Sequence, residues 1–270
     1  MLGTNGRAGN PLAAKLLQFM PLSSGEQDFL ETLCAREERF RHGQNIFDEG
    51  AAPRSAFVVT RGMACRYRLL PDGRRQILSF LIPGDFSELH VFLLEAMDHS
   101  VGALMSTRIA AIERDIVVDI ATNRPRLGAA LWWCAMQEAA MARERIVALG
   151  RRNARGRVAY LLCELVWRQR AIQVVEDHTI RLPLTQTDLG DALGLTAVHI
   201  NRVLQRFRQD RLIKLQQRRL TIADFARLQA IAGLTPAYLQ LNSTPVGVIR
   251  YIDDLERGRP DRADGPVNES

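Results

Sequence analysis

The 270-residue chain contains only four cysteines, and no two of them form a CxxC pair. They are Cys34, Cys65, Cys134 and Cys163. Such scattered positions argue against a zinc site and against a disulfide framework. We therefore expect reduced thiols, most of them buried.

Long apolar runs are also absent. The longest ones fall far below the roughly 20 residues that span a bilayer. Residues 1–22 show no apolar stretch followed by a cleavage site of small residues, which a secretory signal requires. These absences argue against a membrane span and a secretory signal, and they predict a cytoplasmic protein.

The positive charge is small overall but concentrated in one stretch. The formal net charge is +6. Residues 1–150 carry 17 basic and 17 acidic side chains, residues 151–219 carry 14 and 6, and residues 220–270 carry 5 and 7. An excess of +8 within 151–219 suits a polyanionic partner. A solvated basic surface without a partner would give the same counts, so charge alone does not decide.

The N-terminal half changes from helical to β-rich patterning. Residues 1–10 are rich in Gly and Asn and indicate a loose arm. Ser23 or Ser24 is placed to cap a helix, with Glu26 or Gln27 closing a capping box. Between 41 and 115, short β-rich runs alternate with turn residues. The expected strands are 57–60, 64–70, 76–82 and 104–112, and this pattern predicts a β-roll of the jelly-roll kind.

A long helix follows. Apolar residues recur at spacings near three and four between 127 and 149, and Gly150 is placed to end the helix. Its length would be about 37 Å at 1.5 Å per residue. A seam between two copies of the chain is one interpretation, and a core helix packed on its own β domain is the other. A second amphipathic helix is expected at 155–169.

Residues 184–222 indicate a winged helix-turn-helix. Thr185 can cap a first helix, with Asp188 completing a capping box. Gly194 can end that helix in a left-handed conformation, and Thr196 can cap the second. The second helix has an apolar face, formed by Ile200, Val203, Leu204 and Phe207. A hairpin of 213–215 with 220–222 would form the wing.

The opposite face of the second helix suits a DNA groove. Arg202 can donate two hydrogen bonds to guanine, while Asn201 and His199 can contact base edges or phosphates. Hydroxyls and backbone N–H groups at helix starts suit phosphate oxygens. The candidate DNA-binding residues are Thr185, Gln186, Thr196, Ala197, Val198, His199, Asn201, Arg202, Arg206, Lys214, Arg218 and Arg219.

These residues resemble the CRP/FNR family of bacterial transcription regulators over roughly 15–230. The shared motifs are Thr-Gln-Thr-Asp-Leu-Gly at 185–190, Leu-Gly-Leu-Thr at 193–196, Asn-Arg-Val-Leu at 201–204, Gly-Gln-Asn-Ile-Phe at 43–47 and Ile-Pro-Gly-Asp-Phe at 82–86. The resemblance implies an α+β fold with a β-roll sensor domain of the cyclic-nucleotide-binding type (15–122), a dimerisation helix (123–150) and a winged helix-turn-helix (151–232). A partly disordered extension would follow at 233–270. It also implies a homodimer that binds double-stranded DNA and RNA polymerase.

Two departures from the family pattern concern specificity. Arg202 occupies the place of the family's guanine-reading arginine, but Val198 stands where a glutamate often precedes it. The family's cyclic-nucleotide site would place a candidate effector pocket at Glu88, Leu89, His99 and Ser100. His99 stands where an arginine would hold the cyclic phosphate, so the resemblance argues against cyclic AMP. Scattered cysteines argue against the iron–sulfur cluster of the FNR branch, and no cofactor is evident.

Two other functions fit parts of the pattern. A cupin-like metalloenzyme could use a jelly roll, but such sites need closely spaced ligands; the five histidines are scattered, with no His-x-His. A ligand-binding regulatory module could use its winged helix to bind a protein. The concentrated basic charge favours a DNA-binding regulator, which is not an enzyme, over both.

Overall fold

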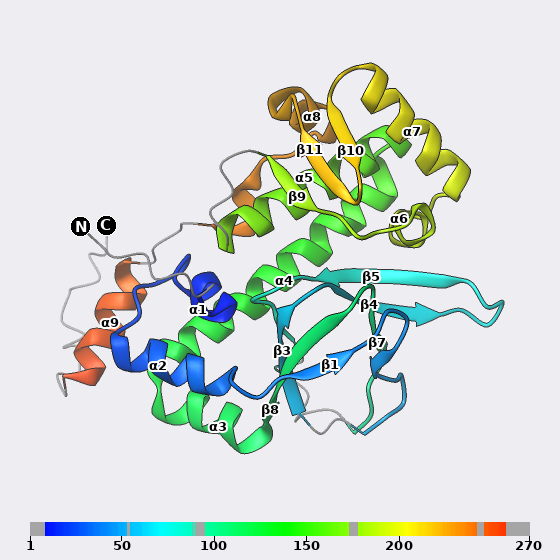
Figure 1. The fold of residues 1–270 in the computed structure, drawn as a ribbon. Coiled ribbons are helices and arrows are strands. Elements are labelled where there is room, and N and C mark those ends of the chain that lie inside the picture. Colours follow the sequence, from blue (N-terminus) through cyan, green and yellow to red (C-terminus); the bar gives the residue numbers. More distant parts are fainter. Residues whose placement is uncertain are drawn as a thin grey trace, which may run out of the picture.

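The computed structural model describes residues 9–52, 55–87, 89, 95–172, 178–241 and 246–257. The β-roll consists of β1 (Glu38–Phe40), β2 (Asn45–Phe47), β3 (Ser55–Arg61), β4 (Ala64–Leu69), β5 (Arg75–Leu81), β6 (Phe86–Ser87), β7 (Ser100–Ala103) and β8 (Thr107–Glu113). One sheet has the order β1-β8-β3-β6 and the other β2-β7-β4-β5. All strand pairs in both sheets are antiparallel. The predicted jelly-roll-like domain is therefore present (Figure 1).

Helices cover one side of the roll. They are α1 (Pro11–Leu16), α2 (Ser24–Leu33), α3 (Arg114–Asn123) and α4 (Pro125–Arg151). Ser23 caps α2 in the expected capping box with Glu26. Apolar side chains of these helices share a core with β3 and β8. Helix α4 also exposes large apolar side chains, including Trp132, Met136, Ile146 and Val147.

The C-terminal half forms the winged helix-turn-helix. It contains α5 (Ala154–Ile172), β9 (Thr179–Arg181), α6 (Gln186–Leu193), α7 (Ala197–Gln209), β10 (Ile213–Gln216), β11 (Arg219–Ile222) and α8 (Phe225–Ala232). The three strands pair in the order β10-β11-β9. Helix α5 shares one core with α6, α7 and the roll residues Ile77 and Phe80. The roll, the long helix and the winged helix therefore follow in the predicted order, and they pack on one another (Figure 1).

A buried ionic network lies where the roll meets α5. Asp85 accepts hydrogen bonds from Lys15 Nζ at 2.7 Å and from Arg168 Nη2 at 2.5 Å. Arg168 also contacts Glu164, which Arg145 of α4 approaches at 3.6 Å. Burial would raise the pKa of Asp85, but the charges of Arg168 and Lys15 outweigh it and lower the pKa. Since a buried charge is stable only when paired, this network fixes α1, α4 and α5 against the roll.

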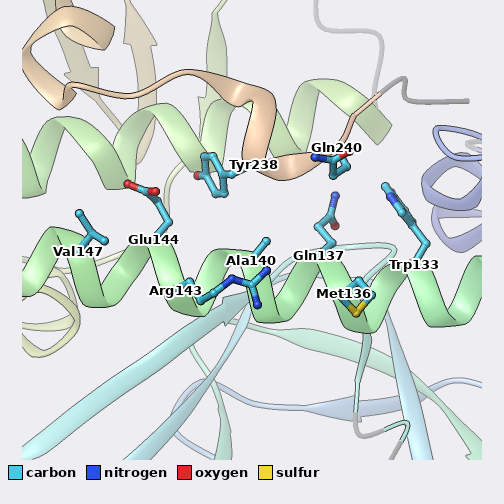
Figure 2. A pocket seen from close by; sticks show the side chains of 9 residues that line it. All are labelled: Trp133, Met136, Gln137, Ala140, Arg143, Glu144, Val147, Tyr238 and Gln240. Atoms are coloured by element: carbon cyan, nitrogen blue, oxygen red, sulfur yellow. The ribbon is translucent and has the colours of Figure 1, made fainter. Parts of the chain in front are cut away.

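The chain beyond α8 returns to the long helix. It forms η2 (Pro236–Leu239) and α9 (Val246–Glu256). Gln137 Nε2 donates to the carbonyl of Leu239 at 2.6 Å, and Arg126 pairs with Asp253. The η2 segment and α4 form the walls of a groove (Figure 2). The sequence predicted no role for the extension at 233–270. The disorder predicted at the end of this extension concerns residues that lie mostly outside the described ranges.

Two predicted boundaries are wrong. The strand expected at 104–112 begins only at Thr107, as β8, because 104–106 form a bend between β7 and β8. Gly150 does not end the long helix; α4 continues to Arg151, and the extended backbone of Arg152 (ψ 144°) ends it. Both differences lie at the ends of elements, where helix and strand boundaries are least sharply defined. Across the described ranges, no helix combines the length and apolar character that crossing a membrane requires.

Candidate nucleic-acid interface

The first helix of the motif, α6, begins with the expected cap. Thr185 Oγ1 accepts from the backbone N–H of Asp188 at 3.0 Å, and Asp188 Oδ2 accepts from the backbone N–H of Thr185 at 2.9 Å. Burial would raise the pKa of Asp188, but the hydrogen bonds from Thr185 and the charge of Arg75 lower it. The carboxylate therefore stays ionised and holds the start of α6 in place.

Two glycines shape the connection between the helices, Gly190 within α6 and Gly194 at its end. Gly194 adopts a left-handed conformation (φ +62°) at the end of α6. Gly190 lies so close to the next segment that a Cβ there would stand 2.4 Å from the carbonyl oxygen of Leu195. Only glycine permits that approach, and it sets the angle between α6 and α7.

The second helix, α7, buries one side and exposes the other. Thr196 Oγ1 caps it by accepting from the backbone N–H of His199 at 3.2 Å. Ile200, Leu204 and Phe207 are buried, while Val203 is half-buried. The predicted DNA-binding residues that are exposed here are Thr196, Ala197, Val198, His199, Arg202 and Arg206. The predicted DNA-facing side of this helix is therefore open along its first turns.

A shallow hollow lies between the starts of α6 and α7. It is lined by Gln186, Ala197, Val198, Asn201 and Arg202. Asn201 is half-buried, and its Nδ2 donates to Gln186 Oε1 at 3.2 Å. Val198 is 60% exposed and supplies an apolar surface within this polar set.

The wing presents basic side chains on a tight turn. Lys214, Arg218 and Arg219 are exposed. Gln217 and Arg218 both have positive φ angles of 48° and 60°, which L-residues rarely adopt. The backbone N–H of Leu182, directly after β9, donates to the carbonyl of Arg218 at 2.8 Å. This hydrogen bond attaches the turn to the end of β9. The wing therefore holds its cations at a fixed place beside α7.

Sequence reasoning missed the side chain that joins the roll to α6. Arg75, at the start of β5, donates to Asp188 Oδ1 at 2.6 Å and to Asp191 Oδ2 at 2.8 Å. These pairs join residues more than 110 positions apart, so no local pattern could have indicated them. Among the predicted site residues, Arg206 contacts Asp210 at 3.4 Å.

His99 and Ser100 of the predicted effector pocket already have polar partners within the protein. Glu88 lies outside the described residues. His99 is buried and its Nδ1 contacts Asp98 Oδ1 at 2.6 Å, while Ser100 Oγ accepts from the backbone N–H of Glu49. Arg66 is a buried arginine among the described roll residues, and it donates to Ser79 Oγ and Ser87 Oγ.

The cysteines lack reactive character. Cys65, Cys134 and Cys163 are buried and Cys34 is half-buried. Burial raises the pKa of Cys34 and Cys134 to about 11 and that of Cys65 and Cys163 to about 12. Because the thiolate is the reactive form, these thiols are inert near neutral pH. In the part of the chain that the structure describes, no three His, Cys, Asp or Glu side chains cluster to hold a metal.

Comparison with known proteins matches both halves of the chain. The family model of the cyclic nucleotide-binding domain matches residues 37–124. The family model of the Crp-like helix-turn-helix domain matches residues 156–231. The nitrogen fixation regulation protein FixK of Bradyrhizobium diazoefficiens is 33% identical over 199 residues, covering 73% of this chain and 82% of FixK. The fumarate and nitrate reduction regulatory protein of Vibrio cholerae is 28% identical, covering 79% and 85%.

A solved structure has the same fold as this chain. FixK2 from Bradyrhizobium japonicum superposes with a TM-score of 0.65 at 27% identity, covering 74% of this chain and 98% of FixK2. These relatives are regulatory proteins rather than enzymes. The chain belongs to the CRP/FNR family and is a transcription regulator with a helix-turn-helix DNA-binding domain.

Proposed function

We propose that the exposed side of α7 reads base edges in the major groove of a specific operator. The observation that carries this proposal is the division of α7, whose apolar side is buried while Arg202 projects into solvent. Arg202 can pair with guanine O6 and N7. Asn201, oriented by Gln186, and His199 lie beside it.

Phosphate contacts would surround this reading helix. Thr185, Gln186 and Thr196 lie at the starts of α6 and α7, where backbone N–H groups attract phosphate oxygens. Lys214, Arg218 and Arg219 would hold the backbone from the wing. The excess of +8 within residues 151–219 supports this arrangement, since phosphate contacts dominate affinity and fix orientation.

We further propose that the protein works as a homodimer through the exposed side of α4. Residues at alternating spacings of four and three form a heptad-like seam on that side, and Trp132 and Ile146 within it are 73% and 70% exposed. The seam consists of Gly128, Trp132, Ala135, Ala139, Ala142, Ile146 and Leu149. Such a repeat is typical of paired helices. A two-fold dimer would bind a pseudo-palindrome with half-sites about 34 Å apart.

The effector differs from cyclic AMP in this proposal. The engagement of His99, Ser100 and Arg66 within the protein supports that distinction. The functional units would be the sensor roll (15–122), the dimerisation helix (123–150), the winged helix-turn-helix (151–232) and the extension (233–270). As in the family, the cytoplasmic dimer would act together with RNA polymerase.

A comparison of two arginines tests the proposal. Genome-wide footprinting of the native protein would first supply an operator. Arg202→Ala should then weaken binding by about 1–3 kcal/mol in a mobility-shift titration. Arg227 is exposed on α8, outside the reading helix and the wing; Arg227→Ala should weaken binding much less. Equal losses for both variants, or no preference of the native protein for any genomic sequence, would overturn the proposal.

A further inference from the structure

A groove lies between α4 and the extension that follows the winged helix. Residues of α4 from Trp133 to Val147 form one wall, and Tyr238 and Gln240 form the other. Its volume is about 400 Å³, which is within the range of small-molecule sites. Figure 2 shows Trp133 and Val147 at opposite ends of the groove. The residues proposed for the dimer seam do not belong to its lining, so a dimer formed through that seam does not need these side chains.

One end of the groove contains a buried hydrogen-bond donor without an acceptor. Trp133 is 6% exposed, and its ring stacks on Phe19 with the ring centroids 5.2 Å apart. Its Nε1 is buried and has no hydrogen-bond partner among the described residues. The neighbouring Gln137 is held in place, because its Nε2 donates to the carbonyl of Leu239 at 2.6 Å. Since a buried donor without a partner is costly, this end of the groove suits a ligand oxygen that accepts from Nε1.

The rest of the lining is mainly apolar and carries one uncompensated charge among its described side chains. Met136, Ala140 and Val147 supply apolar surface. Glu144 is already paired with Arg152, at 2.5 Å. Arg143 is exposed and makes no hydrogen bond or ion pair with a described residue. A guanidinium without a partner beside an apolar wall favours a ligand that carries a carboxylate.

We propose that this groove binds an elongated amphipathic acid. The carboxylate pairs with Arg143, the apolar chain lies along Met136 and Ala140, and an oxygen at the far end accepts from Trp133 Nε1. Arg143 follows Trp133 by ten positions, which is about 15 Å along the helix axis and suits a medium-chain fatty acid with a terminal hydroxyl.

The site belongs to the outer side of α4 and to the extension, rather than to the interior of the roll. Tyr238 and Gln240 lie beyond both matched domains, which end at residues 124 and 231. The Tyr238 hydroxyl donates to Glu164 Oε2 at 3.3 Å, which fixes its ring as part of the wall. The inference does not depend on the proposed operator reading, because it concerns a surface far from α7 in the sequence and can be tested without DNA.

The first experiment titrates the full chain with three probes of equal chain length by isothermal titration calorimetry. The probe ω-hydroxydecanoate carries both polar groups, decanoate lacks the terminal oxygen, and decanediol lacks the anion. Relative to ω-hydroxydecanoate, decanoate should bind about tenfold and decanediol about threefold more weakly. Equal affinities for the three probes, or no saturable binding of ω-hydroxydecanoate, would overturn the proposal.

The second experiment assigns each contact to a side chain. Trp133→Phe keeps the ring but removes the N–H, and should weaken ω-hydroxydecanoate about tenfold while leaving decanoate unchanged. Arg143→Gln should weaken both acids about threefold and leave decanediol unchanged. Trp132→Phe and Arg151→Gln are the matched controls, because both residues are exposed on α4 outside the groove lining, and they should change no affinity. Equal weakening of all three probes by Trp133→Phe or by Arg143→Gln would mean a structural role alone and would overturn the proposal.

Discussion

Replacing Asp85 by asparagine removes the central anion of the buried network. Asp85 is 4% exposed and accepts hydrogen bonds from Lys15, Arg168 and the backbone N–H of Ile82. An amide oxygen can accept from one cation, but the amide nitrogen then faces the other. Asp85→Asn therefore leaves Lys15 without a compensating charge and Arg168 with only Glu164, 3.4 Å away.

The expected cost is about 3–5 kcal/mol, the usual effect of breaking a buried ion pair by removing one partner. For a chain of this size, that cost lowers the melting temperature by roughly 10 °C. Urea unfolding and thermal circular dichroism would measure both quantities. A matched control is Glu49→Gln, which breaks the exposed pair with Arg68 and should change stability by less than about 1 kcal/mol.

A loss below about 1 kcal/mol for Asp85→Asn would refute the reasoning. Such a result would mean that water reaches Lys15 and Arg168 and that the network does not hold α1 and α5 against the roll. A stability loss for Asp85→Asn no larger than that for Glu49→Gln would likewise refute the role of the network.

Three further predictions follow from the same geometry. Gly190→Ala should cost about 1–3 kcal/mol in urea unfolding and abolish specific binding in mobility shifts, because its Cβ would stand 2.4 Å from the Leu195 carbonyl oxygen; wild-type binding would contradict this. Gln217→Gly should relieve the positive φ and stabilise the fold by about 0.5–1 kcal/mol, with unchanged operator affinity; a destabilised variant would argue against that turn. Asp85 and Asp188 have pKa values lowered by folding. They therefore add stability above their unfolded pKa of about 3.9, and this stability is lost as the pH falls through their folded pKa values. A free energy of unfolding that stays constant from pH 5 to pH 2 would contradict this.

Local sequence signals predicted the DNA-binding motif well. Thr185, Asp188, Gly194 and Thr196 each act within a few residues of their own position, through caps and a left-handed turn. The alternation of buried and exposed residues in α7 follows from its 3.6-residue period. Val203 is half-buried rather than fully inside, which is a small deviation from that pattern.

Contacts between distant segments could not be predicted in this way. Arg75 reaches Asp188 across 113 positions, and Lys15 reaches Asp85 across 70. No periodicity encodes such pairs, since each depends on how the whole roll packs on α5. The end of α4 shows the same limit, because Gly150 remains helical there. The return of η2 onto α4 likewise depends on tertiary packing rather than on local composition.

The most direct test of the account is selection of operators from random duplexes by the native protein and by Arg202→Ala. The account predicts that the variant loses its preference for one base pair in each half-site and keeps the remaining profile. An identical profile for the two proteins would contradict it, because the exposed side of α7 would then not read the bases.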